Sequence, residues 1–167
     1  FPFPSWEADQ DLNSAMQNSV NWYFQAIDSQ LGINRVQEFL NKIEYGNQTT
    51  SSNLDLYWSD FSLKISPLEQ VTLLKKFNTN EFHLNFQNVF SVKNAIKIAS
   101  TPNGNFYGKT GTGRVNGQDI NGWFIGYVET SDNSYYFATN IQSDSNATGK
   151  KAFEITSDIL KKLHIWN

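Results

Sequence analysis

The stretch Tyr107–Glu129, YGKTGTGRVNGQDINGWFIGYVE, decides the fold of this chain. Its Gly-Lys-Thr suggests a phosphate-binding loop, which requires a glycine, four further residues and then Gly-Lys-Thr before a helix. The candidate glycine, Gly104, stands one residue too late for that spacing. Asn116-Gly117 is followed by an aromatic and β-branched run, which is typical of a hairpin. The stretch therefore predicts Lys109 on a β-strand and argues against a nucleotide site.

The hairpin continues into a small sheet. Alternating runs separated by the turns NGQD and SDN predict three strands, at about 106–115, 120–130 and 134–142. Consecutive hairpins give an antiparallel arrangement. The last segment, Gly149–Leu163, is expected to be a terminal helix on that sheet, because it carries apolar side chains on one helical face: Ala152, Ile155, Ile159 and Leu163.

The first hundred residues carry helical periodicity instead. Apolar positions spaced by three and four predict one continuous helix over 12–31, and Gly32 ends it. Further helices are expected from a cap at Asn34 to about residue 45, from a Ser66-Pro67 start to about 77, and over 88–99. The predicted fold is α+β: a helical region, then a three-stranded antiparallel meander, then a C-terminal helix packed on the sheet.

Composition limits what the chain can bind. A net charge of −3 and a pI near 5.3 give no broad positive surface, which argues against nucleic acid as a main partner. The absence of cysteine removes disulfides and thiolate chemistry, and His83 and His164 are too isolated in sequence for a metal site. No run of about 18 apolar residues is present, so any membrane attachment is expected in segments outside this sequence. The start, FPFPSWEADQDL, lacks a methionine and a signal-peptide pattern, and we expect the chain to begin within a longer protein.

Lys109, Thr110, Gly111 and Thr112 follow one another on the predicted strand. A lysine ammonium and threonine hydroxyls can bind a carboxylate and take part in proton transfer, and a glycine lets a ligand lie against the backbone. The alternative is a purely structural strand that contains glycine and a solvated lysine. This motif alone does not decide between the two interpretations.

A second motif, Ser19-Val20-Asn21, falls inside the predicted first helix. Its structural alternative is that serine and asparagine occur there by chance and bond back to the helix. Together, however, the two motifs match the Ser-x-Asn and Lys-Thr-Gly elements of penicillin-recognising serine acyl-transferases, in the required order. The remaining element, Ser-x-x-Lys, is absent, since Ser62-Leu63-Lys64 has the wrong spacing.

Longer segments make the resemblance specific. The chain resembles class D (oxacillinase-type) β-lactamases, and still more the extracellular penicillin-sensor domains of the transmembrane β-lactam receptors of Gram-positive bacteria. The similar segments are WEADQDLNSAMQNSVNWYFQAI, YGN, YWSDFSLKISPLEQV and YGKTGTGRVNGQDINGWFIGYVETSDNSYYFAT. The resemblance runs from Phe1 to near Asn167. It implies that residues 1–167 are the C-terminal portion of one penicillin-binding, β-lactamase-like domain.

The resemblance also implies roles for individual residues. Ser19 would pass protons toward the leaving β-lactam nitrogen, and Lys109 would support that transfer with its positive charge. The hydroxyls of Thr110 and Thr112 would hold the carboxylate of the antibiotic. The backbone N–H of Thr112 would form half of an oxyanion hole, and Gly111 between them would let the ligand approach the strand.

Trp58 matches the family tryptophan that packs on the active-site lysine, a lysine that can carry CO2 as a carbamate. The alternative is that Trp58 is an ordinary core aromatic. The nucleophilic serine and this lysine are expected before Phe1, so the chain as given cannot be acylated by itself. No cofactor is expected apart from that possible carbamate, and no metal.

Two further departures bear on function. Oxacillinases place an apolar residue where this chain has Asn21, and a nearby amide would compete for the lysine and favour its decarboxylation, so that deacylation stalls. The arginine that binds the drug carboxylate in many oxacillinases would fall near Lys150. Either Lys150 or the two threonines must serve in its place.

The leading hypothesis is a covalent penicillin-binding sensor of a receptor that induces resistance genes, on the extracellular face of the membrane and with β-lactams as its ligands. The rival is a true class D β-lactamase, secreted or lipid-anchored. A third reading is an inert paralogue that binds peptidoglycan peptides or a partner protein. Whether the complete domain is an enzyme therefore depends on how fast the acyl group is released.

Overall fold

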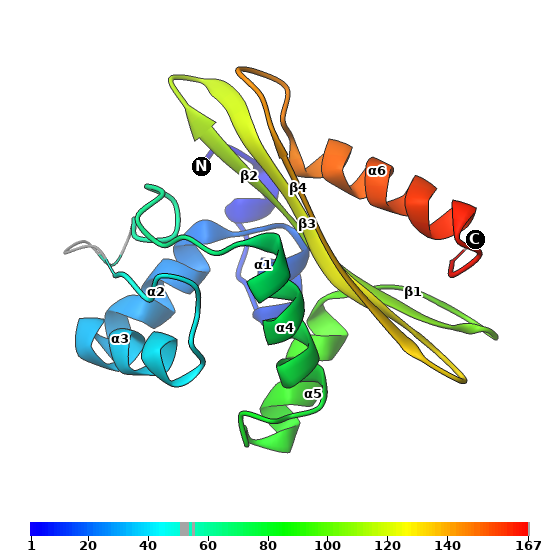
Figure 1. Cartoon of the computed structure of the whole chain (residues 1–167). Helices are drawn as coiled ribbons and strands as arrows, with labels where there is room; N and C mark the ends of the chain where they lie inside the picture. The colour runs from blue at the N-terminus through cyan, green and yellow to red at the C-terminus, as the bar shows by residue number, and fades with distance from the viewer. Residues whose placement is uncertain (51–53, 55, 167) are drawn as a thin grey trace. The chain divides into compact units, whose positions relative to one another are not determined.

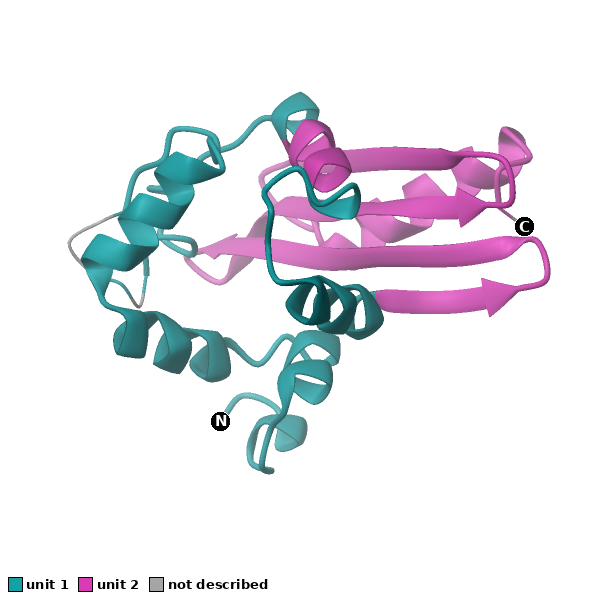
Figure 2. Ribbon diagram, turned by 90° about the horizontal axis from the view of Figure 1, so that it is seen from below, with its two compact units in different colours: residues 1–69, 77–96 teal, residues 70–76, 97–167 magenta. Residues whose placement is uncertain are grey.

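The computed structural model describes residues 1–50, 54 and 56–166, which form two compact units (Figure 2). The first unit comprises residues 1–69 and 77–96, and the second comprises residues 70–76 and 97–167. Helix α4 (Pro67–Asn78) contributes its central turns to the second unit.

The second unit is built on an antiparallel sheet with the strand order β1-β2-β3-β4 (Figure 1). The strands are β1 (Lys97–Thr101), β2 (Gly104–Val115), β3 (Gln118–Thr130) and β4 (Ser134–Gln142). The predicted meander is confirmed, but the predicted number of three strands is wrong, because β1 forms a further hairpin with the start of β2.

The turn between β2 and β3 explains why the sequence predicted the antiparallel meander correctly. Asn116 (φ 49°) and Gly117 (φ 78°) both adopt the left-handed conformation. This two-residue turn has the twist that matches a right-handed strand pair, and asparagine followed by glycine is the sequence that favours it. The hairpin register then pairs Lys109 with Ile125 and Gly111 with Trp123.

Helix α6 (Gly149–Lys162) lies along one face of the sheet, as predicted (Figure 1). Phe106 and Phe124 from the sheet meet edge to face, with ring centroids 6.0 Å apart. Ala152 and Leu160 of α6 complete this buried cluster with Val128. Each large apolar side chain buried here contributes about 2 kcal/mol to folding.

The opposite face of the sheet carries tyrosines. Tyr107 and Tyr127 stack with ring centroids 4.7 Å apart, and Tyr136 lies 5.6 Å from Tyr127. Burial, with the Glu129 carboxylate nearby, raises the pKa of Tyr107 to about 12. Burial raises the pKa of Tyr127 as well, so Tyr107 and Tyr127 are neutral packing groups at ordinary pH.

The first unit is helical, but its first helix differs from the prediction. Instead of one helix over 12–31, the chain forms α1 (Leu12–Gln17) and α2 (Asn21–Leu31), with a break between them. Ser19 has a φ of 52° and cannot continue a helix. The spacing of apolar residues by three and four continues across this break, so the sequence pattern does not indicate it.

Other boundaries were predicted more closely. Helix α3 spans Ile33–Lys42 and is capped by Gly32, so the expected cap at Asn34 is wrong. Helix α4 begins at Pro67 as expected, with Ser66 and Glu69 exchanging hydrogen bonds in a capping box. Helix α5 (Phe86–Ala95) ends before the predicted 99, because the chain turns into β1 there. A short 3-10 turn, η1 (Pro4–Trp6), precedes α1.

None of the helices in the described part of the chain is long and apolar enough to cross a bilayer.

Candidate functional site

Lys109 lies on β2 with its side chain half-buried. Its Nζ donates a 2.8 Å hydrogen bond to the carbonyl oxygen of Thr110. Burial lowers the pKa of the Lys109 ammonium below its ordinary range. The structure thus confirms that Lys109 is on a strand, where its side chain is half-buried and hydrogen-bonded.

The strand pleat separates the motif into two sets. Successive side chains alternate between faces, so Lys109 and Gly111 share one face while Thr110 and Thr112 share the face of α6. Two contacts fix this assignment: the Thr112 hydroxyl oxygen accepts a 2.9 Å hydrogen bond from the Gly149 N–H, and Thr110 Cβ lies beside Gly149. Both threonines remain exposed.

Gly111 is not required by the packing of its own strand. A β-carbon added there would meet only Trp123 Cβ, at an ordinary distance of 3.7 Å. By contrast, a β-carbon at Gly108 would collide with the Phe124 ring at 2.6 Å. Gly108 is therefore explained by the core, whereas Gly111 leaves open backbone beside Lys109, as the ligand interpretation expects.

The motif also occupies an edge. The pairing of β1 with β2 ends at Tyr107, so the described strands give the 108–115 part of β2 only one neighbour, β3. The other side of this stretch has no strand partner among the described residues, and the Thr110 carbonyl accepts from Lys109 Nζ. An oxyanion hole that uses the Thr112 N–H requires such an edge.

Ser19 occupies the joint between α1 and α2. Its N–H donates to the Met16 carbonyl at 3.3 Å, and the Val20 N–H donates to the Ala15 carbonyl at 2.9 Å. These two bonds form a Schellman motif, in which the left-handed position is usually glycine. The prediction that the triplet lies inside a helix is therefore wrong, and Ser19 stands exposed on a sharp turn instead.

The remainder of the triplet is anchored by packing. Val20 is fully buried, whereas Asn21 is the first residue of α2 and is exposed. The indole of Trp6 donates to the Asn18 carbonyl at 3.1 Å, and the indole of Trp22 donates to the Trp6 carbonyl at 3.0 Å. These contacts hold the backbone on both sides of Ser19.

Tyr45-Gly46-Asn47 is tied to the segment that follows Trp58. The Asn47 amide donates to the Ser62 carbonyl at 2.8 Å and accepts from the Lys64 N–H at 2.9 Å. Gly46 has a φ of 50°, and a β-carbon there would lie 1.8 Å from the Lys64 carbonyl oxygen. The YGN and LKIS blocks, distant in sequence, are thus parts of one structure.

Trp58 is half-buried against a small core cluster that contains Val36, Leu40 and Tyr57. Within the described residues this is the packing role of an ordinary core aromatic. Its expected second role, against an active-site lysine, concerns a residue outside this sequence and stays a prediction.

Lys150 is the second residue of α6, next to the Gly149–Thr112 contact. Its side chain is 85% exposed, and its Nζ lies 3.9 Å from a Glu154 carboxylate oxygen. Lys150 is therefore next to the motif but solvated, whereas the Thr112 hydroxyl is held by a hydrogen bond.

The second unit brings together Lys109, Thr110, Gly111, Thr112 and Lys150, where β2 meets the start of α6. Ser19, Asn21 and Trp58 belong to the first unit. The motifs of the sequence do not include Gly149, because a glycine at the start of a helix is typical of a helix boundary and does not indicate a close approach to β2.

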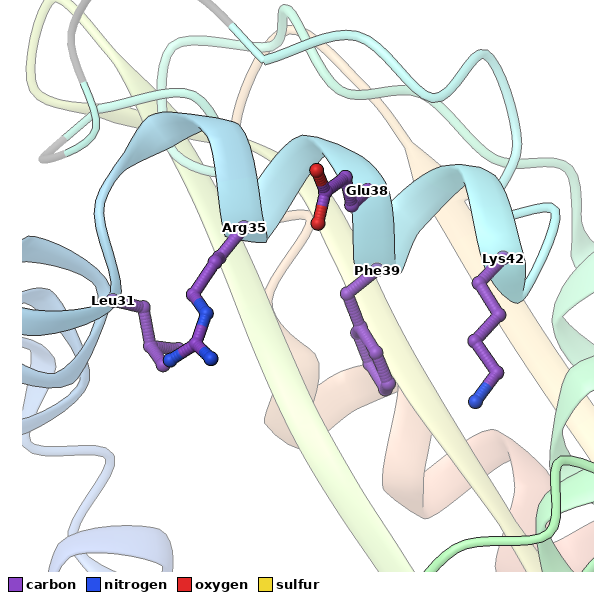
Figure 3. Close-up of a pocket in the computed structure, with 5 residues that line it drawn as sticks. All are labelled: Leu31, Arg35, Glu38, Phe39 and Lys42. Atoms are coloured by element: carbon purple, nitrogen blue, oxygen red, sulfur yellow. The ribbon is translucent and has the colours of Figure 1, made fainter.

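Two other features lie apart from these residues. In the described ranges, no group of three or more His, Cys, Asp and Glu side chains is arranged to hold a metal ion. An open hollow of about 310 Å³ runs along α3, where Phe39 lies between Arg35 and Lys42 (Figure 3). Leu31 and Glu38 also line it, and it contains none of the predicted site residues.

Comparison with known proteins assigns the family. Residues 2–161 match the model of the penicillin binding protein transpeptidase domain. The chain is 47% identical over 166 residues to the regulatory protein BlaR1 of Bacillus licheniformis, covering 99% of this chain and 28% of that protein. The solved C-terminal domain of the B. licheniformis BlaR penicillin-receptor superposes with a TM-score of 0.95 at 46% identity, over 100% of this chain and 68% of that one. A class D β-lactamase from Bacillus subtilis follows with a TM-score of 0.91 at 38% identity, over 99% of this chain and 67% of that one. The chain therefore spans less than a third of the regulatory protein, and it belongs to the penicillin binding protein transpeptidase domain family.

Proposed function

We propose that this chain is the C-terminal part of an extracellular sensor domain that β-lactams acylate, within a membrane receptor whose signal induces antibiotic resistance. The observation that carries the proposal is the end-to-end similarity to a regulatory protein and to a solved penicillin-receptor domain. The arrangement of β2 supports it, because Lys109, Gly111 and Thr112 lie on an edge that a ligand can reach.

The chemistry would be a ring-opening acyl transfer. A serine hydroxyl from a Ser-x-x-Lys segment upstream of this chain attacks the β-lactam carbonyl, the ring C–N bond breaks, and the serine proton reaches the ring nitrogen. Ser19 would relay that proton, and the Lys109 ammonium would stabilise the negative charge. The Thr112 N–H would contribute to the oxyanion hole.

The same residues also fit hydrolysis, for which the similarity to a class D β-lactamase is the supporting observation. The difference lies in deacylation, which needs an activated water and a carbamylated lysine in a dry pocket. Asn21 supports the sensor, because an amide near that lysine favours loss of the carbamate and leaves the acyl group in place. A secreted or lipid-anchored hydrolase is therefore the second candidate.

The test uses the complete domain, in which an upstream Ser-x-x-Lys segment precedes this chain. Incubation with benzylpenicillin and intact-mass spectrometry should show one adduct with the mass of the whole antibiotic, since ring opening releases no leaving group. Replacing the upstream serine by alanine should abolish the adduct. If saturating benzylpenicillin forms no adduct, the covalent proposal is wrong, and a non-covalent paralogue is the better description.

A further inference from the structure

The start of α6 is joined to β2 by a contact that the sequence motifs do not include. The Gly149 N–H donates to the Thr112 hydroxyl oxygen at 2.9 Å, across 37 residues of chain. Gly149 is buried, while Thr112 is exposed. The neighbouring Thr148 hydroxyl caps the helix separately by accepting from the Lys151 N–H at 3.1 Å. The first N–H of α6 is therefore satisfied by the candidate ligand-binding strand.

This contact sets the direction in which the Thr112 hydroxyl can donate. A threonine hydroxyl has one hydrogen and two lone pairs. Because one lone pair accepts from Gly149, the hydroxyl hydrogen points away from α6 and is available to an acceptor on the exposed side. A carboxylate is an acceptor-only group, and a hydrogen bond to it is stronger than one to a neutral oxygen. The positive end of the α6 dipole further favours an anion at this position.

The contact exists only because residue 149 has no side chain. A β-carbon there would lie 2.6 Å from the Gly111 carbonyl oxygen, 2.9 Å from the Gly111 nitrogen and 2.9 Å from Thr110 Cβ. Two of these three atoms are backbone, so they cannot rotate away. Gly149 does not have a positive φ, so any residue could adopt its backbone conformation. Glycine is needed there because a side chain would collide with β2.

We infer that Gly149 is a positioning residue: it lets α6 approach β2, and its N–H orients the Thr112 hydroxyl as a donor to the carboxylate of the bound β-lactam. This inference rests on the proposed function. It adds a positioning residue, Gly149, to the contact between Thr112 and the carboxylate that the family resemblance implies.

The experiment compares four variants of the complete domain: Thr112→Val, Thr112→Ser, Gly149→Ala and the Thr112→Val/Gly149→Ala double variant. The second-order rate constant of acylation is measured with benzylpenicillin and with its methyl ester. Thr112→Val and Gly149→Ala should each lower the rate constant for benzylpenicillin by about 10-fold or more, and that for the ester much less. Thr112→Ser should stay near the unsubstituted domain. The double variant should lose no more selectivity for the acid over the ester than Thr112→Val alone, since both changes remove one interaction.

Lys151→Ala, an exposed change in the same helical turn, is the matched control and should leave both rate constants unchanged. Equal losses for the acid and the ester, or a further loss of selectivity in the double variant, would overturn the inference. Because Gly149→Ala risks a folding defect, Thr112→Val is decisive by itself: unchanged selectivity between acid and ester in that variant also overturns it. If the unsubstituted domain forms no adduct with either compound, the proposed function fails, and this inference fails with it.

Discussion

Asn47 and Lys64 exchange two hydrogen bonds of 2.9 Å, from the Asn47 N–H to the Lys64 carbonyl and from the Lys64 N–H to the Asn47 side-chain oxygen. A third bond joins the Asn47 amide to the Ser62 carbonyl. A single asparagine thus fixes the backbone of the segment that follows Trp58. The YGN block and the segment that follows Trp58 therefore depend on each other for their conformation.

Replacing Asn47 by alanine should therefore destabilise the domain by about 2 kcal/mol, because its side-chain hydrogen bonds with the backbones of Ser62, Lys64 and, at 3.4 Å, Thr49 are lost. Urea unfolding measures this change. Asn34→Ala, at an exposed position of α3, is the matched control and should change stability by less than about 0.5 kcal/mol. Equal stability of the two variants would show that the Asn47 bonds do not hold the segment.

Ser19 should show a conflict between stability and activity. Ser19→Gly removes the cost of a side chain at positive φ and should stabilise the domain by up to about 1 kcal/mol, whereas Ser19→Ala keeps the β-carbon and should not. Both variants lose the hydroxyl, and both should acylate about 100-fold more slowly if Ser19 relays the proton. Thermal unfolding and intact-mass kinetics give the two readouts. An alanine variant that acylates at the normal rate would remove Ser19 from the mechanism.

The sequence predicted those features that a few neighbouring residues determine, and it missed those that depend on contacts elsewhere in the chain. Asn116-Gly117 and the Ser66-Pro67 start are decided by their own backbone preferences, and both were predicted. The α1–α2 break was missed, because its left-handed residue is serine rather than glycine and the apolar spacing continues through it. Strand β1 was missed because its mostly exposed residues show no alternation of burial.

The candidate site was predictable only as far as its motifs. Lys109, Thr110, Gly111 and Thr112 could be placed on a strand, and the pleat then determines which of them share a face. The approach of Gly149 to that strand is a tertiary contact, and no local pattern encodes it. The environment of Trp58 was left open between core and ligand, and the described contacts are those of a core residue.

The pH dependence of acylation should report Lys109. Burial lowers its pKa below the ordinary 10.5, so the ammonium is lost as pH rises through a value under 10.5. If the charge assists acylation, the rate constant should fall over that alkaline range. Lys109→Arg, which stays charged, should lack the fall even if its overall rate is lower. A wild-type rate that stays constant up to pH 10.5 would contradict an electrostatic role.

The capping box of α4 should contribute stability that depends on pH. Hydrogen bonds from the Ser66 hydroxyl and N–H lower the pKa of Glu69 below its ordinary 4.5. A lowered carboxyl pKa stabilises the folded state fully above pH 4.5, and the contribution is lost as pH falls through the folded-state pKa. The difference in melting temperature between the unsubstituted domain and Glu69→Gln should therefore be constant near neutrality and shrink in acid. A difference that does not change with pH would argue against the ionised capping box.

The central claim, that the complete domain is a sensor rather than a hydrolase, is tested most directly by the lifetime of its penicillin adduct. The domain is pulsed with benzylpenicillin, freed of excess drug and followed by intact mass, beside Asn21→Val. We expect the unsubstituted adduct to persist for a cell generation and the Asn21→Val adduct to disappear faster. An unsubstituted adduct that vanishes within seconds while penicilloate accumulates would contradict the sensor function and identify a β-lactamase.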